Sequence, residues 1–122
     1  MATLNVTLGI TSTDATSENL NIGASDVLTI GNPIESTSKA TVDTVSVFNI
    51  LTSAANTNIT YVFVKNADAT NVITLKDDAG NSIIDLSAGE FAFLPVKGGI
   101  GLEALANVAP CDIEYGFWTK YK

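Results

Sequence analysis

The sequence contains no histidine and no arginine, and its only cysteine is Cys111. Histidine is the commonest general base and a frequent metal ligand, so its absence removes most catalytic triads and zinc sites. A single cysteine cannot form an internal disulfide, which indicates a fold made in a reducing cytoplasm. We therefore expect no metal, no cofactor, no small-molecule substrate and no catalytic residues.

Positive charge is also scarce. Six lysines stand against 13 acidic residues, which gives a net charge of −7. Binding of nucleic acid or of an anionic membrane surface requires clustered basic residues, and these lysines are spread along the chain. No apolar run approaches the roughly 20 residues of a membrane-spanning helix, and the first residues do not form a secretory signal. We expect neither nucleic acid nor membrane as a partner.

Hydrophobic residues, by contrast, are plentiful. They make up 46% of the 122 residues, and charged residues only 16%. The mean hydropathy is +0.29, which is high for a chain long enough for a single domain. Two explanations stay open: threonine, serine and asparagine supply the polar surface, or a partner or neighbouring copy covers part of it.

Alternation of apolar and polar residues predicts short strands through most of the chain. Polar and glycine-containing turns separate them, so we predict an all-β, antiparallel β-sandwich or jelly-roll-like barrel. Residues 101–109 fit a helix or a strand, and the surrounding hairpins favour the strand. The predicted core residues are Val45, Val47, Tyr61, Phe63, Ile73, Leu75, Ile84, Leu86, Phe91, Phe93, Leu102, Ile113 and Tyr115.

The first third of the chain differs from the rest. Residues 1–40 read as an N-terminal arm or edge strands, with residues 11–26 as a loop or extended segment, and residues 41–122 as the sandwich body. The arm holds few large apolar side chains, barely enough to offset a backbone ordering entropy of about 1–2 kcal/mol per residue. We expect it to be ordered by adding strands to a neighbouring subunit or a shell, with Leu4, Val6 and Leu8 as anchors.

Carboxylates offer the first possible chemistry. Asp77 with Asp78, or Glu103 with Glu114 if their strands are neighbours, could form a glycosidase pair. Exposed loop and surface acids explain all four equally simply. The segment 77–81 has many oxygen atoms but lacks the spacing and closing glutamate of a calcium loop, so we predict a hairpin turn in which Gly80 takes a positive φ.

A cysteine and a glycine-rich segment could each suggest a reactive or binding site, but a structural role explains both better. Cys111 lies on the apolar side of an alternating segment, which predicts a buried thiol rather than a nucleophile. Gly98, Gly99 and Gly101 superficially suggest a phosphate loop, but no Lys-Ser or Lys-Thr pair follows them. We predict that the protein is not an enzyme.

Aromatic residues gather near the C-terminus, at Phe117, Trp118 and Tyr121. Period-two alternation points Trp118 away from Phe117. An exposed tryptophan on a β-sandwich indicates a sugar platform or an interface anchor, whereas a tryptophan at the edge of the core indicates neither. Trp118 and Tyr121 join Leu4, Val6 and Leu8 as candidate interaction residues.

From Tyr61 onward, about half of the chain resembles small structural proteins of tailed bacteriophages, notably head decoration (cement) proteins. The segments that carry the resemblance are Tyr61-Val-Phe-Val-Lys-Asn-Ala-Asp68, Ser87-Ala-Gly-Glu-Phe-Ala-Phe-Leu-Pro95, Lys97-Gly-Gly-Ile-Gly-Leu102 and Cys111-Asp-Ile-Glu-Tyr115. These are signatures of a kind of β-domain rather than of catalysis.

The resemblance implies a non-enzymatic virion protein that binds capsomer junctions and stabilises the shell. Its partners would be a major capsid protein and further copies of itself, most simply in a homotrimer. Repulsion between an acidic chain and packaged DNA favours the capsid exterior, after synthesis in the bacterial host cytoplasm. The alternatives are a tail, neck or fibre-associated virion protein, and a carbohydrate-binding β-sandwich module.

Overall fold

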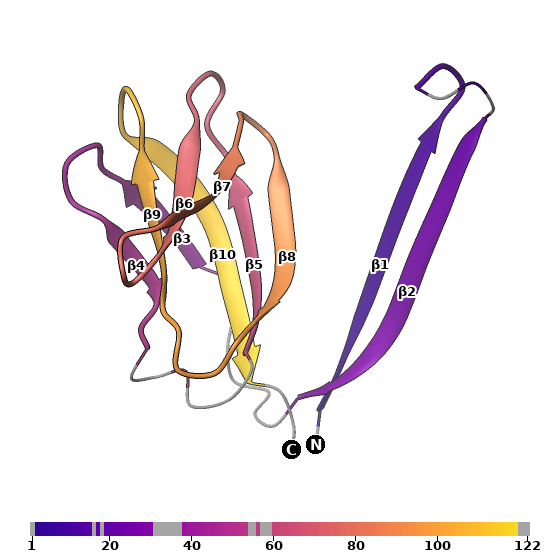
Figure 1. Ribbon diagram of the computed structural model, residues 1–122, viewed down its shortest axis with the longest axis horizontal. Coiled ribbons are helices and arrows are strands. Elements are labelled where there is room, and N and C mark those ends of the chain that lie inside the picture. Colours follow the sequence, from indigo (N-terminus) through magenta and orange to yellow (C-terminus); the bar gives the residue numbers. More distant parts are fainter. Residues whose placement is uncertain are drawn as a thin grey trace.

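A computed structural model describes residues 2–15, 17, 19–30, 38–53, 56 and 60–119 (Figure 1). That part of the chain is all-β, as predicted, and no helix in it is long and apolar enough to cross a membrane. The strands are β1 (Ala2–Ser12), β2 (Leu20–Ile30), β3 (Ser38–Val42), β4 (Phe48–Leu51), β5 (Thr60–Asn66), β6 (Ile73–Asp77), β7 (Ser82–Leu86), β8 (Phe91–Val96), β9 (Leu102–Ala106) and β10 (Cys111–Thr119).

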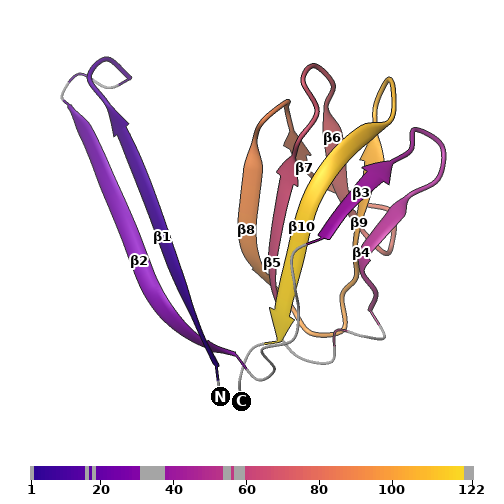
Figure 2. The same ribbon diagram turned by 180° about the vertical axis from the view of Figure 1, so that it is seen from behind.

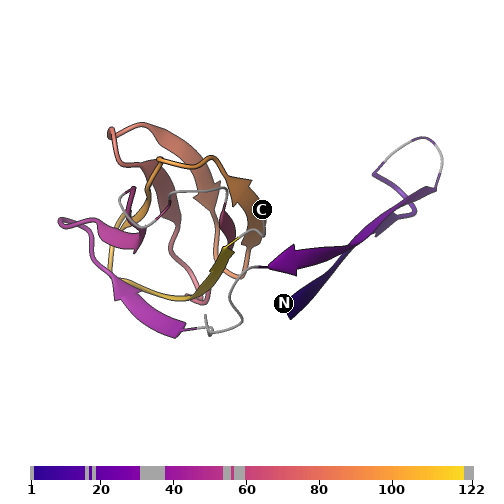
Figure 3. The same cartoon turned by 90° about the horizontal axis from the view of Figure 1, so that it is seen from below.

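Strands β3 to β10 form a sandwich of two four-stranded antiparallel sheets. The orders are β3-β10-β5-β8 and β4-β9-β6-β7. Every connection except β6–β7 passes from one sheet to the other, and the first strand pairs with the last, as in an eight-stranded jelly roll. Figures 2 and 3 show the two layers from behind and from below. The predicted fold class is confirmed, and residues 102–106 form a strand.

The β6–β7 turn uses the chemistry that its sequence predicts. Gly80 has a φ of 92°, a value that glycine adopts without steric cost. The Asp77 carboxylate accepts hydrogen bonds from the backbone N–H groups of Ala79 and Asn81, at 3.0 and 2.8 Å. This turn joins β6 to β7, the only consecutive strands of the sandwich that lie in the same sheet.

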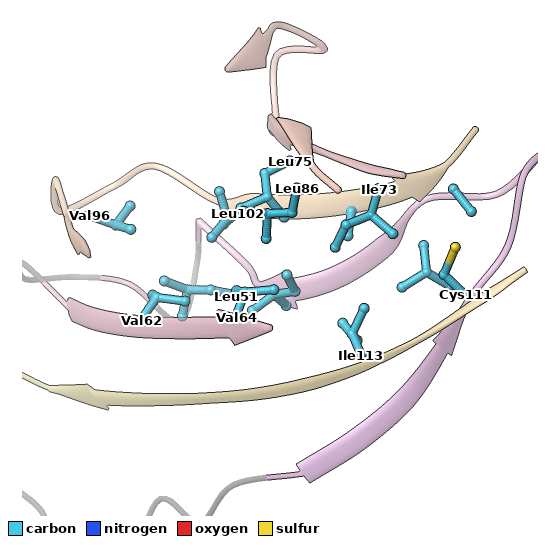
Figure 4. Close-up of a cluster of buried hydrophobic side chains, with 14 residues drawn as sticks. Leu51, Val62, Val64, Ile73, Leu75, Leu86, Val96, Leu102, Cys111 and Ile113 are labelled. Atoms are coloured by element: carbon cyan, nitrogen blue, oxygen red, sulfur yellow. The ribbon is translucent and has the colours of Figure 1, made fainter. Parts of the chain in front are cut away.

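The core lies between the two sheets. Figure 4 shows Val62 and Val64 of β5 facing Leu75 and Leu102 across the interior. The buried hydrophobic cluster consists of Val42, Ile50, Leu51, Val62, Val64, Ile73, Leu75, Leu86, Val96, Leu102, Ala104, Ala106, Cys111 and Ile113.

The predicted core was correct in the central strands. Ile73, Leu75, Leu86, Leu102 and Ile113 are all buried there. Two more predicted residues, at positions 84 and 115, are half-buried and pack against the cluster. Strict alternation in these strands identified the inward face correctly.

The prediction was wrong for the valines before β4. Val45 and Val47 are 84% and 38% exposed, because the strand begins only at Phe48. Apolar, β-branched residues in this segment favoured a longer strand than the one that forms.

The prediction also chose the wrong face of β5 and β8. Val62 and Val64 point into the sandwich, whereas Tyr61 and Phe63 lie on the outer face of the sheet. Tyr61 is nevertheless buried, as predicted, at 7% exposed, with its ring stacked on that of Phe93. On β8, Phe91 is 58% exposed. Almost every position of β5 is apolar, so alternation could not identify the inward side.

Residues 2–12 and 20–30 pair as a separate two-stranded antiparallel hairpin, β1–β2. Its eleven paired positions run from Ala2 with Ile30 to Ser12 with Leu20. The expected loop over residues 11–26 is therefore wrong at residues 11–12 and from Leu20 onward, because pairing between β1 and β2 supplies hydrogen bonds to segments of weak strand propensity. The body begins at Ser38, inside the expected arm, because β3 pairs with β10.

Candidate functional site

The β1–β2 hairpin has one apolar and one polar face. Side chains alternate along each strand, and directly paired residues lie on the same face. The pairs Leu4 with Leu28 and Ile10 with Ile22 therefore share one side. We call this set the apolar stripe: Leu4, Val6, Leu8, Ile10, Ile22 and Leu28. The opposite face carries mainly threonine, serine, asparagine and glycine.

The apolar stripe is poorly covered. Leu8, Ile10 and Ile22 are 44%, 43% and 51% exposed. Figure 1 shows the hairpin standing beside the body, with its turn end projecting farthest from the rest of the chain. Only at its base is a large side chain fully buried, at Ile30. A two-stranded hairpin alone is marginally stable in water, so this stripe needs a surface to pack against.

A second apolar surface lies on the outer side of the β3-β10-β5-β8 sheet. Tyr61 is paired with Pro95 on one side and with Trp118 on the other, and Phe63 with Phe93. The rings of Tyr61 and Phe93 stack at 5.9 Å with an interplanar angle of 15°. We call this the aromatic face: Tyr61, Phe63, Phe91, Phe93, Pro95 and Trp118.

The apolar stripe and the aromatic face line the same cleft. Its volume is about 760 Å³. The hairpin contributes Val6, Leu8 and Leu28 to the lining, and the body contributes Tyr61 and Phe91 among others. The two surfaces thus face each other without filling the space between them.

Charge is sparse around this cleft. Asp26 is the only charged residue in the two hairpin strands, and it is paired with Val6 of the apolar stripe. On the body, Lys65 is paired with Phe91 on one side and with Glu114 on the other. Glu114 also pairs with Lys39, so the row carries two lysines and one glutamate.

Comparisons of the chain with family models, with curated proteins and with solved structures find no match.

The candidate interaction residues from the sequence fall on both surfaces. Leu4, Val6 and Leu8 belong to the apolar stripe, and Leu4 and Val6 are half-buried. Trp118 is half-buried on the aromatic face, and Phe117 packs against the core on the other side, as alternation predicted. Tyr121 lies outside the described residues.

Sequence reasoning missed other members of the two surfaces. Ile10, Ile22 and Leu28 belong to the apolar stripe, but the strand that carries the last two was not recognised in full. Phe91 and Phe93 were assigned to the core. Pro95 indicated only that this segment is an edge strand, since proline within a sheet is confined mainly to edge strands, and β8 is one. It does not indicate which face the two rings lie on.

The acidic pairs considered for catalysis are not assembled. Glu103 lies on β9 and Glu114 on β10, which belong to different sheets. Hydrogen bonds from the Asn81 side chain and then from backbone N–H groups lower the pKa of Asp77, so its carboxylate is engaged in the turn. Among the described residues, no three acidic, cysteine or histidine side chains gather as a metal site would require.

The cysteine and the glycine segment both have structural surroundings. Cys111 is fully buried, and burial, followed by the charges of Asp68 and Asp112, raises the pKa of its thiol. A raised pKa opposes formation of the nucleophilic thiolate. At Gly101, a Cβ atom would lie 3.0 Å from the carbonyl oxygen of Leu51, so close packing requires glycine there.

Proposed function

We propose that this chain is a non-enzymatic virion structural protein, a capsid decoration protein that binds the outer shell at capsomer junctions. The observation that carries the proposal is the pair of incompletely covered apolar surfaces, the apolar stripe and the aromatic face. Contiguous exposed apolar surface is typical of proteins that function in contact with other proteins.

Fold and charge support the same proposal. The jelly roll is an architecture shared by viral capsid proteins and lectins, which is a fold-level analogy. A net charge of −7 opposes contact with packaged DNA and favours a place outside the shell. In this proposal the sandwich body is the rigid part and the projecting hairpin makes the contacts that hold it in place.

The hairpin offers two ways to bind. Its apolar stripe can pack face to face, and the outer edges of β1 and β2 can receive a further strand, as in strand addition. A homotrimer at a capsomer junction would present three hairpins to the shell. Such repetition raises avidity because the second and third contacts form within an already bound complex.

The test is co-sedimentation with empty shells assembled from the capsid protein encoded in the same genome. We expect the full chain to sediment with the shells and a chain lacking residues 1–37 to stay in solution. A genome without a capsid protein, or shells that bind the truncated chain equally well, would contradict the proposal.

Matched variants separate the stripe from the rest of the hairpin. Ile10→Asp with Ile22→Asp places two charges on the apolar stripe, at a directly paired position. Thr11→Asp with Asn21→Asp places two charges on the polar face one residue away. We expect the first variant to lose shell binding and the second to keep it. Cryo-electron microscopy of complete particles then distinguishes a head position from tail, neck or fibre.

A second candidate function rests on the rings of Phe91 and Phe93, which line the cleft beside the buried Tyr61. Flat aromatic surfaces on β-sandwiches can stack against sugar rings, so a carbohydrate-binding module is the alternative. Titration calorimetry with soluble oligosaccharides tests it. Binding that is lost in Phe91→Ala, together with no shell binding, would favour the module over the decoration protein.

A further inference from the structure

We propose that copies of this protein exchange hairpins, so that the apolar stripe of one copy packs on the aromatic face of another. The first partner of the hairpin is then a second copy of the chain. The exchange rests on the proposed function only in taking the hairpin as an assembly element, because it requires no shell.

The two surfaces are complementary in chemistry and belong to one chain. The stripe presents aliphatic side chains such as Leu8 and Ile22, and the facing surface presents the rings of Phe91 and Phe93. Within one chain the two surfaces face each other across a cleft of about 760 Å³ and do not fill it. Every copy therefore carries both halves of an interface, which is the requirement for a closed homo-oligomer.

A short tether, the connection between the hairpin and the body, explains why the hairpin of one chain does not pack fully on the aromatic face of the same chain. Only residues 31–37 separate the end of β2 from the start of β3, so the base of the hairpin must stay near its own body. The burial pattern agrees, because Ile30 at the base is 3% exposed and Ile22 farther out is 51% exposed. In a second copy no such tether applies, and the outer part of the stripe can centre on the aromatic face.

Lengths lead to the same conclusion. At about 3.4 Å per residue, the eleven-residue hairpin strands extend for about 37 Å, whereas the seven residues of β5 extend for about 24 Å. A hairpin fixed at its base therefore extends beyond its own aromatic face. The projecting part carries Ile10 and Ile22, whereas Leu8 still lines the cleft.

The aromatic face limits the area that a docked hairpin can cover. Two strands about 4.8 Å apart, over the roughly 24 Å of β5, present a face of roughly 230 Å². One docked hairpin then covers roughly 460 Å² over both partners. Two copies that exchange hairpins with each other share roughly 900 Å² of contact, which is the size of a small, weak interface.

Charge is compatible with the exchange. Asp26 brings one negative charge to the stripe side of the hairpin. The Lys39, Glu114 and Lys65 row of the aromatic sheet holds one more positive than negative charge. A second copy can therefore bring Asp26 toward Lys65, and the long lysine stem can lie along the ring of Phe91 while its ammonium group stays hydrated.

The first test measures mass in solution by size-exclusion chromatography with light scattering. We expect the full chain to elute at a multiple of 12.7 kDa. Ile10→Asp with Ile22→Asp should elute as a monomer, and Thr11→Asp with Asn21→Asp should keep the wild-type mass. A monomeric wild type, or equal masses for both variants, would overturn the proposal. Circular dichroism shows whether the variant body keeps its strands.

The second test separates exchange from closure within a chain, by disulfide trapping in a Cys111→Ala background. Chains carrying Leu8→Cys are mixed with size-tagged chains carrying Phe91→Cys and oxidised. We expect a mixed-size, cross-linked product, and much less of it when Thr11→Cys replaces Leu8→Cys. A Leu8→Cys, Phe91→Cys double variant that cross-links only within its own chain, with no product between chains, would refute exchange.

The results also separate this inference from the proposed function. A protein that stays monomeric yet sediments with shells refutes the exchange and supports the decoration role. A protein that forms cross-linked oligomers but ignores shells supports the exchange and contradicts the decoration role.

Discussion

Replacement of Asn66 by alanine should destabilise the body more than any surface change. Asn66 is fully buried at the end of β5, and its side chain bonds to two other backbone segments, the β5–β6 loop and the end of β7. The Nδ2 group donates to the carbonyl oxygens of Asn71 and Leu86, at 2.8 and 2.9 Å. The Oδ1 atom accepts from the backbone N–H of Asp68 at 3.0 Å.

The magnitude follows from these three bonds. Each intramolecular hydrogen bond contributes about 0.5–1.5 kcal/mol, and each buried group left without a partner costs about 1–3 kcal/mol. The Leu86 carbonyl is bonded within a buried region, so at least one group loses its partner away from water. We expect Asn66→Ala to lower the free energy of unfolding by about 3–5 kcal/mol, which corresponds to a Tm lower by roughly 10–20 °C for a domain of this size.

Urea denaturation followed by tryptophan fluorescence measures this loss. The control is Asn107→Ala, which removes one exposed hydrogen bond, from the Val72 N–H at 3.2 Å, and should cost less than about 1 kcal/mol. A cost for Asn66→Ala equal to that of the control would show that the buried asparagine does not hold the loops together.

Three further outcomes are expected. Leu75→Ala should cost about 3–5 kcal/mol and Phe93→Ala about half as much, since only the former is fully buried; equal losses in urea would contradict the assigned faces. As the pH is lowered from the ordinary pKa of 3.8 through the lowered pKa of Asp77 in the folded protein, stability should decrease, because the ionised carboxylate favours the fold. Asp77→Asn should make the free energy of unfolding less dependent on pH in this range. A chain of residues 38–122 should keep the far-UV circular dichroism of a β-protein, and a largely disordered spectrum would show that the body requires the hairpin.

Much of the fold could be predicted from the sequence because the central strands alternate strictly. Ile73 and Leu75 of β6 occupy every second position, and the polar residues between them face outward. Gly80 marked the tight turn correctly, since only glycine takes its backbone angle without strain. Local rules of this kind require no knowledge of the partner strand.

The candidate site could not be predicted in the same way, because it depends on long-range pairing. Gly23 and Ser25 have weak strand propensity, and their place in β2 follows only from pairing with Gly9 and Thr7. Along β5 both faces are apolar, so Tyr61 and Val62 looked equally suited to the core. Which of them points inward is decided by the opposing sheet, and no pattern within β5 contains that information.

The structure also bears on the two explanations of the chain's high mean hydropathy. If polar threonine and serine simply replaced charge, exposed apolar side chains would be scattered over the surface. Several of the largest, Leu8, Ile10, Ile22 and Phe91, instead lie on the stripe and the aromatic face. The other exposed large apolar side chains among the described residues lie elsewhere: Val27 on the opposite face of the hairpin, Ile83 on β7, and Val45, Val47, Ile100 and Val108 in connecting segments. Such spread is ordinary for a protein surface. The four that gather on two facing surfaces are the part of the hydropathy that the second explanation accounts for, in which neighbouring copies or a shell keep those surfaces away from water.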